Sequence, residues 1–196
     1  MQPYLPRNGV SGSPYSEAGA LYALGLIHAN KGGSGDSAVV SFLTDALRNA
    51  GVNEVVQHGS CLGIGLAGMA TGNPELFGEL QKILFLDSAV AAEGAALSIG
   101  LLLLGMSDSQ LAQEEVPELL TWAHNTTHEK VVRAVSLAVA MTVYGKEEGG
   151  DSIIEQVTTD HVRKDQLVET SLLFLFSLFF PPSSSFLADD MICHFP

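Results

Sequence analysis

The sequence predicts an all-α protein, an α-solenoid of about four two-helix repeats. Two observations carry this prediction: an apolar segment rich in small residues recurs four times, and a more polar amphipathic stretch follows each copy. Subtracting the residue numbers of the matched positions gives separations of 40, 35 and 40 residues for Gly25, Gly65, Gly100 and Ala140. Such a period is typical of helical hairpins that stack so that each repeat contacts only its neighbours.

The first helix of each repeat is expected in the small-residue segment, at 18–27, 59–68, 94–103 and 134–143. Residues able to cap a helix precede the four segments: Ser13, Asn53, Asp87 and Thr127. The second segment contains four glycines, Gly59, Gly63, Gly65 and Gly68. Because each glycine weakens a helix by about 1 kcal/mol relative to alanine, we expect the glycines at close contacts between helix backbones.

The second helix of each repeat is expected in the polar stretch that follows a glycine break. These stretches are Ser37–Asn49, Pro74–Leu84, Gln110–His124 and Asp151–Thr158, and the breaks are at Gly32-Gly33, Gly72-Asn73-Pro74, Gly105 and Gly145. The sequence therefore predicts eight helices in four hairpins. The repeats occupy about 13–50, 53–86, 87–126 and 127–160 of a domain that spans 1–160.

Residues 161–196 are expected to form a divergent tail rich in Phe, Ser and Pro, because the helical period fails there. Its apolar run, about ten residues long, is too short to span a bilayer. One hypothesis for the abrupt break is an altered reading of the transcript. Another expectation is that Leu172–Phe180 folds over the open end of the fourth repeat.

Composition narrows the classes of partner. The net charge of −13, from 22 acidic and 9 basic residues, repels phosphate backbones and anionic lipids, so neither nucleic acid nor a membrane is expected as a partner. Two cysteines, Cys61 and Cys193, make no disulfide framework, and Met1–Arg7 lacks the apolar core of a signal peptide. Cytoplasm and nucleus are the expected compartments.

Several strings within the repeats are specific enough to indicate a family. Residues 15–30 (YSEAGALYALGLIHAN), 57–67 (QHGSCLGIGLA) and 127–133 (THEKVVR) resemble the proteasome/cyclosome repeat family, in the form found in large non-ATPase scaffold subunits of the proteasome regulatory particle. The similarity runs from about Tyr4 to Asp160. The resemblance implies a solenoid that closes into a ring in the family, so that four repeats form only an arc of the toroid.

The resemblance also implies a function. It points to a non-catalytic scaffold of the regulatory particle that supports ubiquitin-dependent protein degradation by contacting other ATPase and non-ATPase subunits. The alternative within binding modules is a free-standing helical-repeat adaptor, or a truncated decoy, outside the proteasome.

Other patterns could indicate chemistry. Gly63–Gly68 fits G-x-G-x-x-G with Asp87 about 20 residues later, which leaves a dinucleotide-binding enzyme as a rival. Three matching windows share its small residues without the pattern, so helix packing is favoured. His124, His128 and Glu129 supply too few ligands for a tight zinc site, and Cys61 has no local base. No catalytic residue, cofactor or metal ligand is therefore predicted.

Charged and polar residues interrupt the apolar segments. Glu93 lies within the run from Ala89 to Gly105, which leaves it short of the roughly 18 uninterrupted residues that a membrane span needs. Similar residues lie in or beside the other segments: Glu17, His58 and Arg133. We expect these four side chains near the starts of the first helices, hydrogen-bonded across repeats.

Overall fold

The computed structural model describes residues 13–32, 37–86 and 88–145, and these form seven α-helices without a strand. The all-α prediction is therefore confirmed over this part of the chain. The predicted helix Asp151–Thr158 and the predicted tail lie outside the described residues. The helices are α1 (Pro14–Ile27), α2 (Ser37–Asn49), α3 (Glu54–Ala67), α4 (Pro74–Leu84), α5 (Ala89–Leu102), α6 (Gln110–Asn125) and α7 (Glu129–Thr142).

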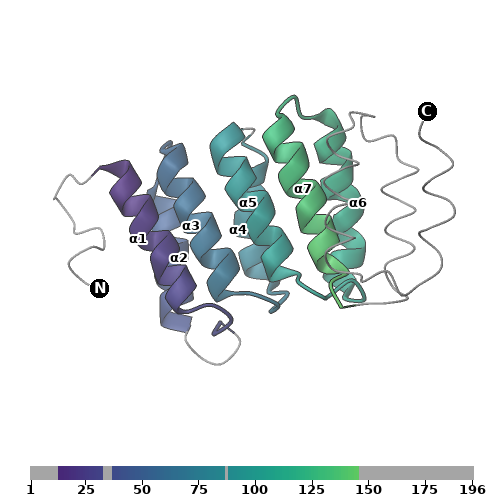
Figure 1. The fold of residues 1–196 in the computed structure, drawn as a ribbon, viewed down its shortest axis with the longest axis horizontal. Coiled ribbons are helices and arrows are strands. Elements are labelled where there is room, and N and C mark those ends of the chain that lie inside the picture. The colour runs from purple at the N-terminus through teal and green to yellow at the C-terminus, as the bar shows by residue number, and fades with distance from the viewer. Residues whose placement is uncertain (1–12, 33–36, 87, 146–196) are drawn as a thin grey trace, which may run out of the picture.

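The helices stack in two layers, as an α-solenoid requires (Figure 1). In one layer α1 packs on α3, α3 on α5 and α5 on α7; we call this the odd layer. The even helices cover it from behind, and each packs mainly on the odd helix of the following repeat: α2 on α3, α4 on α5 and α6 on α7. The even helices thus connect successive repeats to one another.

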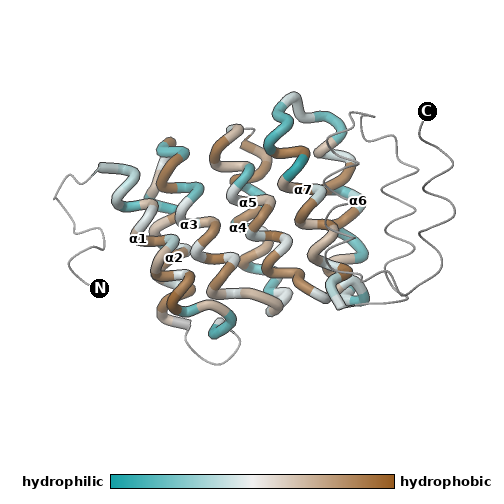
Figure 2. Tube along the Cα trace, in the orientation of Figure 1, coloured by the Kyte–Doolittle hydropathy of each residue, from teal (hydrophilic) through white to brown (hydrophobic). Residues whose placement is uncertain are grey.

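The core lies between the two layers. Its largest fully buried side chains are aliphatic and come from both layers, among them Leu21, Leu43, Ile64, Leu80, Ile99 and Val135. Hydrophobic residues also run along the odd helices in Figure 2. Among these helices α1 and α5 lack the separate polar and apolar faces of a surface helix, whereas α7 keeps them.

Some helices begin at the residues that the sequence predicts, and others do not. The bounds of α2 and α4 match the prediction, and the Asn53 side chain caps α3 by accepting from the Val56 N–H at 3.2 Å. Asp87 lies outside the described residues, and α5 is capped instead by Ser88, whose Oγ accepts from the Ala91 N–H at 3.3 Å.

The predicted cap of the fourth repeat was wrong by one residue. His128 is the N-cap of α7, not Thr127, and its side chain makes no capping hydrogen bond. The physical reason lies in the preceding turn: α6 continues to Asn125, Thr126 is its C-cap, and the Thr126 hydroxyl accepts from the His128 N–H at 3.3 Å. This turn delays the start of α7 by one position.

Candidate functional site

The most regular feature of the molecule is the contact between neighbouring odd helices. After α1, the chain turns and donates two backbone hydrogen bonds to the end of α3, from Asn30 N to Leu66 O at 2.9 Å and from Gly32 N to Ala67 O at 2.8 Å. The last carbonyls of a helix have no intrahelical donor, so these bonds satisfy groups that would otherwise be left open.

The same pair of bonds recurs at the next two contacts, each at 3.0 Å. After α3, Ala70 N and Gly72 N donate to Leu101 O and Leu102 O; after α5, Gly105 N and Ser107 N donate to Met141 O and Thr142 O. We call the donating segment the donor turn and the two carbonyls the acceptor end. One donor turn and one acceptor end make each of the three described contacts.

Each donor turn begins with a residue in the left-handed conformation. The φ angles are 58° at Asn30, 54° at Ala70, 68° at Gly105 and 74° at Gly145, and these positions are again 40, 35 and 40 residues apart. The glycine breaks predicted at Gly32 and Gly72 fall on the residue that donates the second hydrogen bond of each turn. They lie two residues after the left-handed residue with which the turn begins. Asparagine visits the left-handed conformation more readily than most residues, so Asn30 is a sequence signal for the first donor turn. Ala70 is no such signal for the second turn, because the left-handed conformation costs alanine about 1–2 kcal/mol.

Close backbone contacts accompany the hydrogen bonds. A Cβ on Gly25 would overlap the backbone of Gly63, and a Cβ on Gly59 would overlap the backbone of Ala18. A Cβ on Gly65 would lie 2.6 Å from Ser98 Cα, and a Cβ on Gly100 would lie 2.5 Å from Ala138 Cα. The expectation that small residues mark contacts between helix backbones is confirmed at these positions.

The G-x-G-x-x-G window has a packing role in this structure. Gly63 and Gly65 lie inside α3, and Gly68 is its C-cap, so the window lacks the strand-to-helix turn that holds a pyrophosphate. A Cβ on Gly63 would come within 2.8 Å of Leu21 O. The helix geometry thus contradicts the premise of the dinucleotide-binding alternative.

The polar residues near the helix starts link repeats at two of the expected places. His58 Nδ1 lies 2.8 Å from Val90 O, a distance at which a ring N–H donates to the carbonyl, and Glu93 forms an ion pair with Lys130 at 3.8 Å. Arg133 instead pairs within its own helix, with Glu129 at 3.5 Å. The helix spacing favours that pair because residues four positions apart share a face.

The thiol and the histidines considered as candidate nucleophile and metal ligands are either buried in the core or set apart from one another. Cys61 is fully buried, and this burial raises the pKa of its thiol, which keeps the sulfur protonated. His124 lies in the last turn of α6, His128 precedes α7 and Glu129 begins it. Over the described ranges, no three His, Cys, Asp or Glu side chains gather as metal ligands would.

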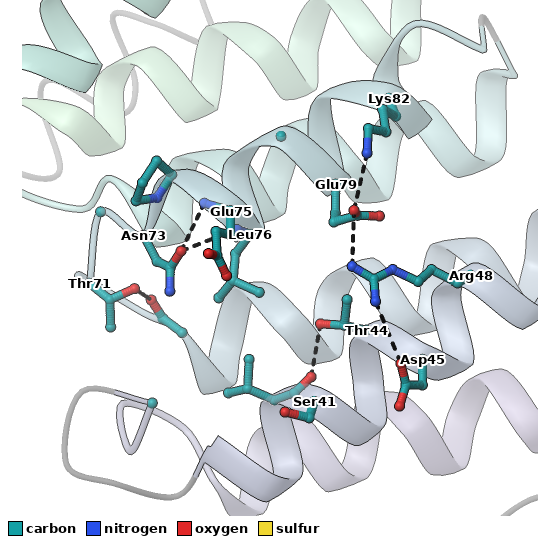
Figure 3. Close-up of a pocket in the computed structure, with 16 residues that line it drawn as sticks. Ser41, Thr44, Asp45, Arg48, Thr71, Asn73, Glu75, Leu76, Glu79 and Lys82 are labelled. Carbon is teal, nitrogen blue, oxygen red and sulfur yellow. Dashed lines mark hydrogen bonds and ion pairs between the residues drawn. The ribbon is translucent and has the colours of Figure 1, made fainter.

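A groove of about 1210 Å³ runs between the even helices α2 and α4 (Figure 3). Arg48 crosses it, donating from Nη2 to Glu79 Oε1 at 3.1 Å, and Lys82 Nζ reaches the same oxygen at 3.1 Å. The Arg48 hydrogen bond holds the pKa of the Glu79 carboxyl below its usual value. Arg48 also pairs with Asp45 at 3.7 Å, so two cations face two carboxylates and this cluster of four side chains carries no net charge.

The outer side of α1 exposes large apolar side chains. Ile27 is 52% exposed, whereas the residues at the same repeat position, Ala67, Leu102 and Thr142, are each 1% exposed or less. Tyr15, Tyr22 and Leu26 on the same helix are also exposed. Exposed apolar surface of this kind marks sites of association, so the surfaces of the stack are the strongest candidate functional site.

Comparison with known proteins identifies relatives over the whole chain. No protein-family model matches. The chain is 45% identical, over all of its length, to 26S proteasome non-ATPase regulatory subunit 1 homolog A of Arabidopsis thaliana. It is 34% identical to 26S proteasome non-ATPase regulatory subunit 1 of Drosophila melanogaster over 99% of its length, and 42% identical to 26S proteasome regulatory subunit rpn2 of Schizosaccharomyces pombe over 82%.

The chain spans only a part of these relatives: 18% of the Arabidopsis and Drosophila proteins and 16% of the fission yeast protein. The Arabidopsis alignment includes residues 161–196, the predicted tail. Where the tail begins stays a prediction, since that segment lies outside the described residues. In the part of the chain that the structure describes, no helix combines the length and apolar character needed to cross a membrane.

Proposed function

This chain is a member of the family of 26S proteasome non-ATPase regulatory subunit 1, and from that premise we propose that it is a non-catalytic scaffold element of the proteasome regulatory particle. In this role it supports ubiquitin-dependent degradation by holding other subunits in place. Because the chain spans 18% of the Arabidopsis relative, it supplies a segment of the solenoid and not the whole scaffold.

One observation carries the proposal furthest: three successive contacts between odd helices repeat the same pair of backbone hydrogen bonds. A solenoid built this way acts through its extended surface, since every repeat presents loops and helix faces in a regular array. The relatives are named non-ATPase subunits. In the described part of this chain, glycines such as Gly25, Gly65 and Gly100 lie at contacts between helices, the Cys61 thiol is buried in the core, and the buried hydroxyls of Ser60, Ser98 and Ser136 bond to carbonyls of their own helices. These contacts support a structural role.

The partners that we propose are other subunits of the regulatory particle, both ATPase and non-ATPase, in the cytoplasm and the nucleus. The charge of −13 favours protein surfaces with basic patches and disfavours nucleic acid and anionic membranes. The groove between α2 and α4 and the exposed side chains of α1 provide two separate surfaces for such contacts.

Affinity purification tests this proposal. The tagged full chain is expressed in Arabidopsis cells, whose own relatives are 44–45% identical, and the purified material is analysed for proteasome subunits. A Gly65→Leu chain, in which the contact with Ser98 is disrupted, is the matched control. We expect regulatory-particle ATPase and non-ATPase subunits with the native chain and much less of both with the variant.

Two outcomes would contradict the proposal. Recovery of non-proteasomal proteins without regulatory-particle subunits would support the free-standing adaptor instead. Equal recovery of proteasome subunits by the native chain and the Gly65→Leu chain would show that their capture does not depend on the stacked repeats.

A further inference from the structure

The C-terminal ends of α4 and α6 bring two aromatic side chains together on the even layer. Phe85 is the C-cap of α4 and Trp122 lies in the last turn of α6, and their ring centroids are 5.9 Å apart. Phe85 is 41% exposed, and Leu86, the next residue, is 59% exposed. We call Phe85, Leu86 and Trp122 the aromatic patch. Aromatic side chains that pack on a core and remain partly open are typical anchors for a binding partner.

The aromatic patch lies within the stack and not at one of its ends. The even helices on both sides of α4, which are α2 and α6, are described (Figure 1). A second contact joins α4 to α6, because Gln81 Nε2 donates to Glu115 Oε2 at 2.9 Å. We call the line of these two contacts the α4–α6 seam. The exposure of Phe85 is therefore not that of a terminal repeat.

Carboxylates without cations continue the seam on α6. Glu114, Glu115 and Glu118 lie one to two turns before Trp122, and α6 contains no lysine or arginine. Among the described residues, no lysine or arginine forms an ion pair with any of the three. Partial burial and the charges of Glu118 and Glu114 raise the pKa of the Glu115 carboxyl. These carboxylates repel one another, and a cation placed among them would relieve that repulsion.

The neighbouring space between α2 and α4 shows what the α4–α6 seam lacks. There Arg48 and Lys82 both bond to Glu79, so the two even helices neutralise each other's charge. On α6 a further acceptor is open instead, because Pro117 has no N–H to donate to the Gln113 carbonyl, and both residues are exposed. The exposed side of α6 thus presents acceptors to which a lysine or an arginine can donate.

We propose that the α4–α6 seam binds an amphipathic helix of a partner protein, which sets apolar side chains on the aromatic patch and lysine or arginine side chains against the carboxylates of α6. Charge complementarity identifies this occupant, because a second copy of the chain carries a net charge of −13 and is repelled. A helix laid along an apolar surface between two others is a recurring mode of recognition. The assignment names the chemistry of one partner surface of the proposed scaffold, and it rests on that role.

The geometry of α6 sets the spacing of the partner's residues. With a rise of about 1.5 Å per residue, Glu118 lies about 6 Å and Glu114 about 12 Å from Trp122 along the helix axis. A partner helix antiparallel to α6 therefore carries its apolar residues first and its basic residues one and two turns later. Basic residues at that end also complement the partner's own helix dipole.

Tryptophan fluorescence tests the proposal at the site itself, because Trp122 is the only tryptophan of the chain. The probe is a synthetic helix of about four turns without tryptophan, built on alanine and glutamine. It carries leucines in its first two turns and lysines in its last two, all on one face. Titrated into the full chain, it should shift the Trp122 emission to shorter wavelength, saturate, and bind more weakly as salt is added. A peptide with glutamates in place of the lysines should not bind.

Substitutions locate the contact. Glu118→Gln should weaken binding of the lysine peptide about 2- to 5-fold, the effect of one exposed ion pair. Glu75→Gln is the matched control, since Glu75 is an exposed carboxylate of α4 that lines the groove toward α2, and it should leave the dissociation constant unchanged. Leu86→Ser should weaken binding about 10-fold or more, as loss of a buried leucine contact does. Thermal melts confirm that each variant is folded.

Three kinds of result would overturn the proposal. Trp122 emission that does not respond to the lysine peptide would show that the seam does not take a basic helix. Equal binding of the glutamate peptide, or equal weakening by Glu118→Gln and Glu75→Gln, would contradict recognition by charge at the seam. Emission that changes with chain concentration alone would identify a second copy as the occupant. None of these results affects the recovery of proteasome subunits, so this inference and the proposed function fail separately.

Discussion

Gly65 of α3 lies against Ser98 of α5 so closely that a Cβ on Gly65 would come within 2.6 Å of the Ser98 Cα. The side chain that Gly65 lacks is therefore replaced by the backbone of the next repeat. Replacing Gly65 by leucine should destabilise the chain by roughly 1–3 kcal/mol or more, because overpacking forces the helices apart. Urea unfolding measures the loss.

The control for this prediction is Gly78→Leu. Gly78 is helical with nothing within 4 Å of its Cβ position, so the better helix former should leave stability unchanged or raise it by about 1 kcal/mol. A gain in stability from Gly65→Leu would show that the glycine is there for a reason other than close packing.

Ala70 should be improved by glycine. It holds a left-handed φ of 54° while its N–H donates to Leu101 O, so the conformation is fixed by the repeat contact and strained for alanine. Ala70→Gly should stabilise by about 1 kcal/mol, although glycine usually destabilises through chain entropy. Ala46→Gly, inside α2, should destabilise by about 0.5–1 kcal/mol. The same sign for both changes would contradict this reading.

Cys61 should make stability depend on alkaline pH. Burial raises its pKa in the folded chain, so above about pH 9, the ordinary value, the unfolded thiol loses its proton while the folded thiol keeps it. The unfolded state is then favoured, and the free energy of unfolding should fall by up to about 1.4 kcal/mol per pH unit from this group. The stability that Cys61 contributes is fully present below pH 9.

Comparison of the native chain with Cys61→Ala isolates this effect from other alkaline titrations. The difference in unfolding free energy between the two should be constant below pH 9 and should shift against the native chain above it. A difference that stays flat to pH 10.5, about 1.5 pH units past the ordinary value, would show that the thiol is exposed to titration in the folded state.

The Arg48 bridge across the groove should contribute little to stability. Its side chain is 57% exposed, and Lys82 remains to neutralise Glu79 after the arginine is removed. Arg48→Met should therefore cost less than about 1 kcal/mol, and the cost should shrink as salt is added. A salt-independent loss of several kcal/mol would mean that the arginine stem, and not its charge, holds α2 to α4.

The sequence anticipated the features that depend on residue type. Polar and proline punctuation at Ser37 and Pro74 marked the bounds of two even helices, and the small residues at Gly65 and Gly100 marked the backbone contacts. The sequence does not show which of two adjacent residues caps a helix when both are able to do so. At Asp87 and Ser88 this choice depends on the turn that precedes the helix, and Ser88 is the cap.

Features set by the neighbouring repeat were not visible in the sequence. Ala70 has no preference for a left-handed conformation and adopts it because its N–H is bonded to the next odd helix. The sequence also does not show that each even helix packs mainly on the odd helix of the following repeat. Packing on the odd helix of its own repeat would bury the same apolar face, so the spacing of apolar residues is the same in both cases. The candidate surface on α1 became apparent only when Ile27 could be compared with its buried equivalents.

The most direct test of the stacked-repeat account compares alanine at two equivalent glycines. Gly59 packs on the backbone of Ala18, and Gly19, one repeat earlier, has nothing within 4 Å of its Cβ position. The measurement is the unfolding free energy of the monomeric chain at low concentration. The account predicts opposite signs: Gly59→Ala destabilises, and Gly19→Ala stabilises by about 1 kcal/mol as helix propensity alone dictates. Stabilisation of the chain by both substitutions would contradict it.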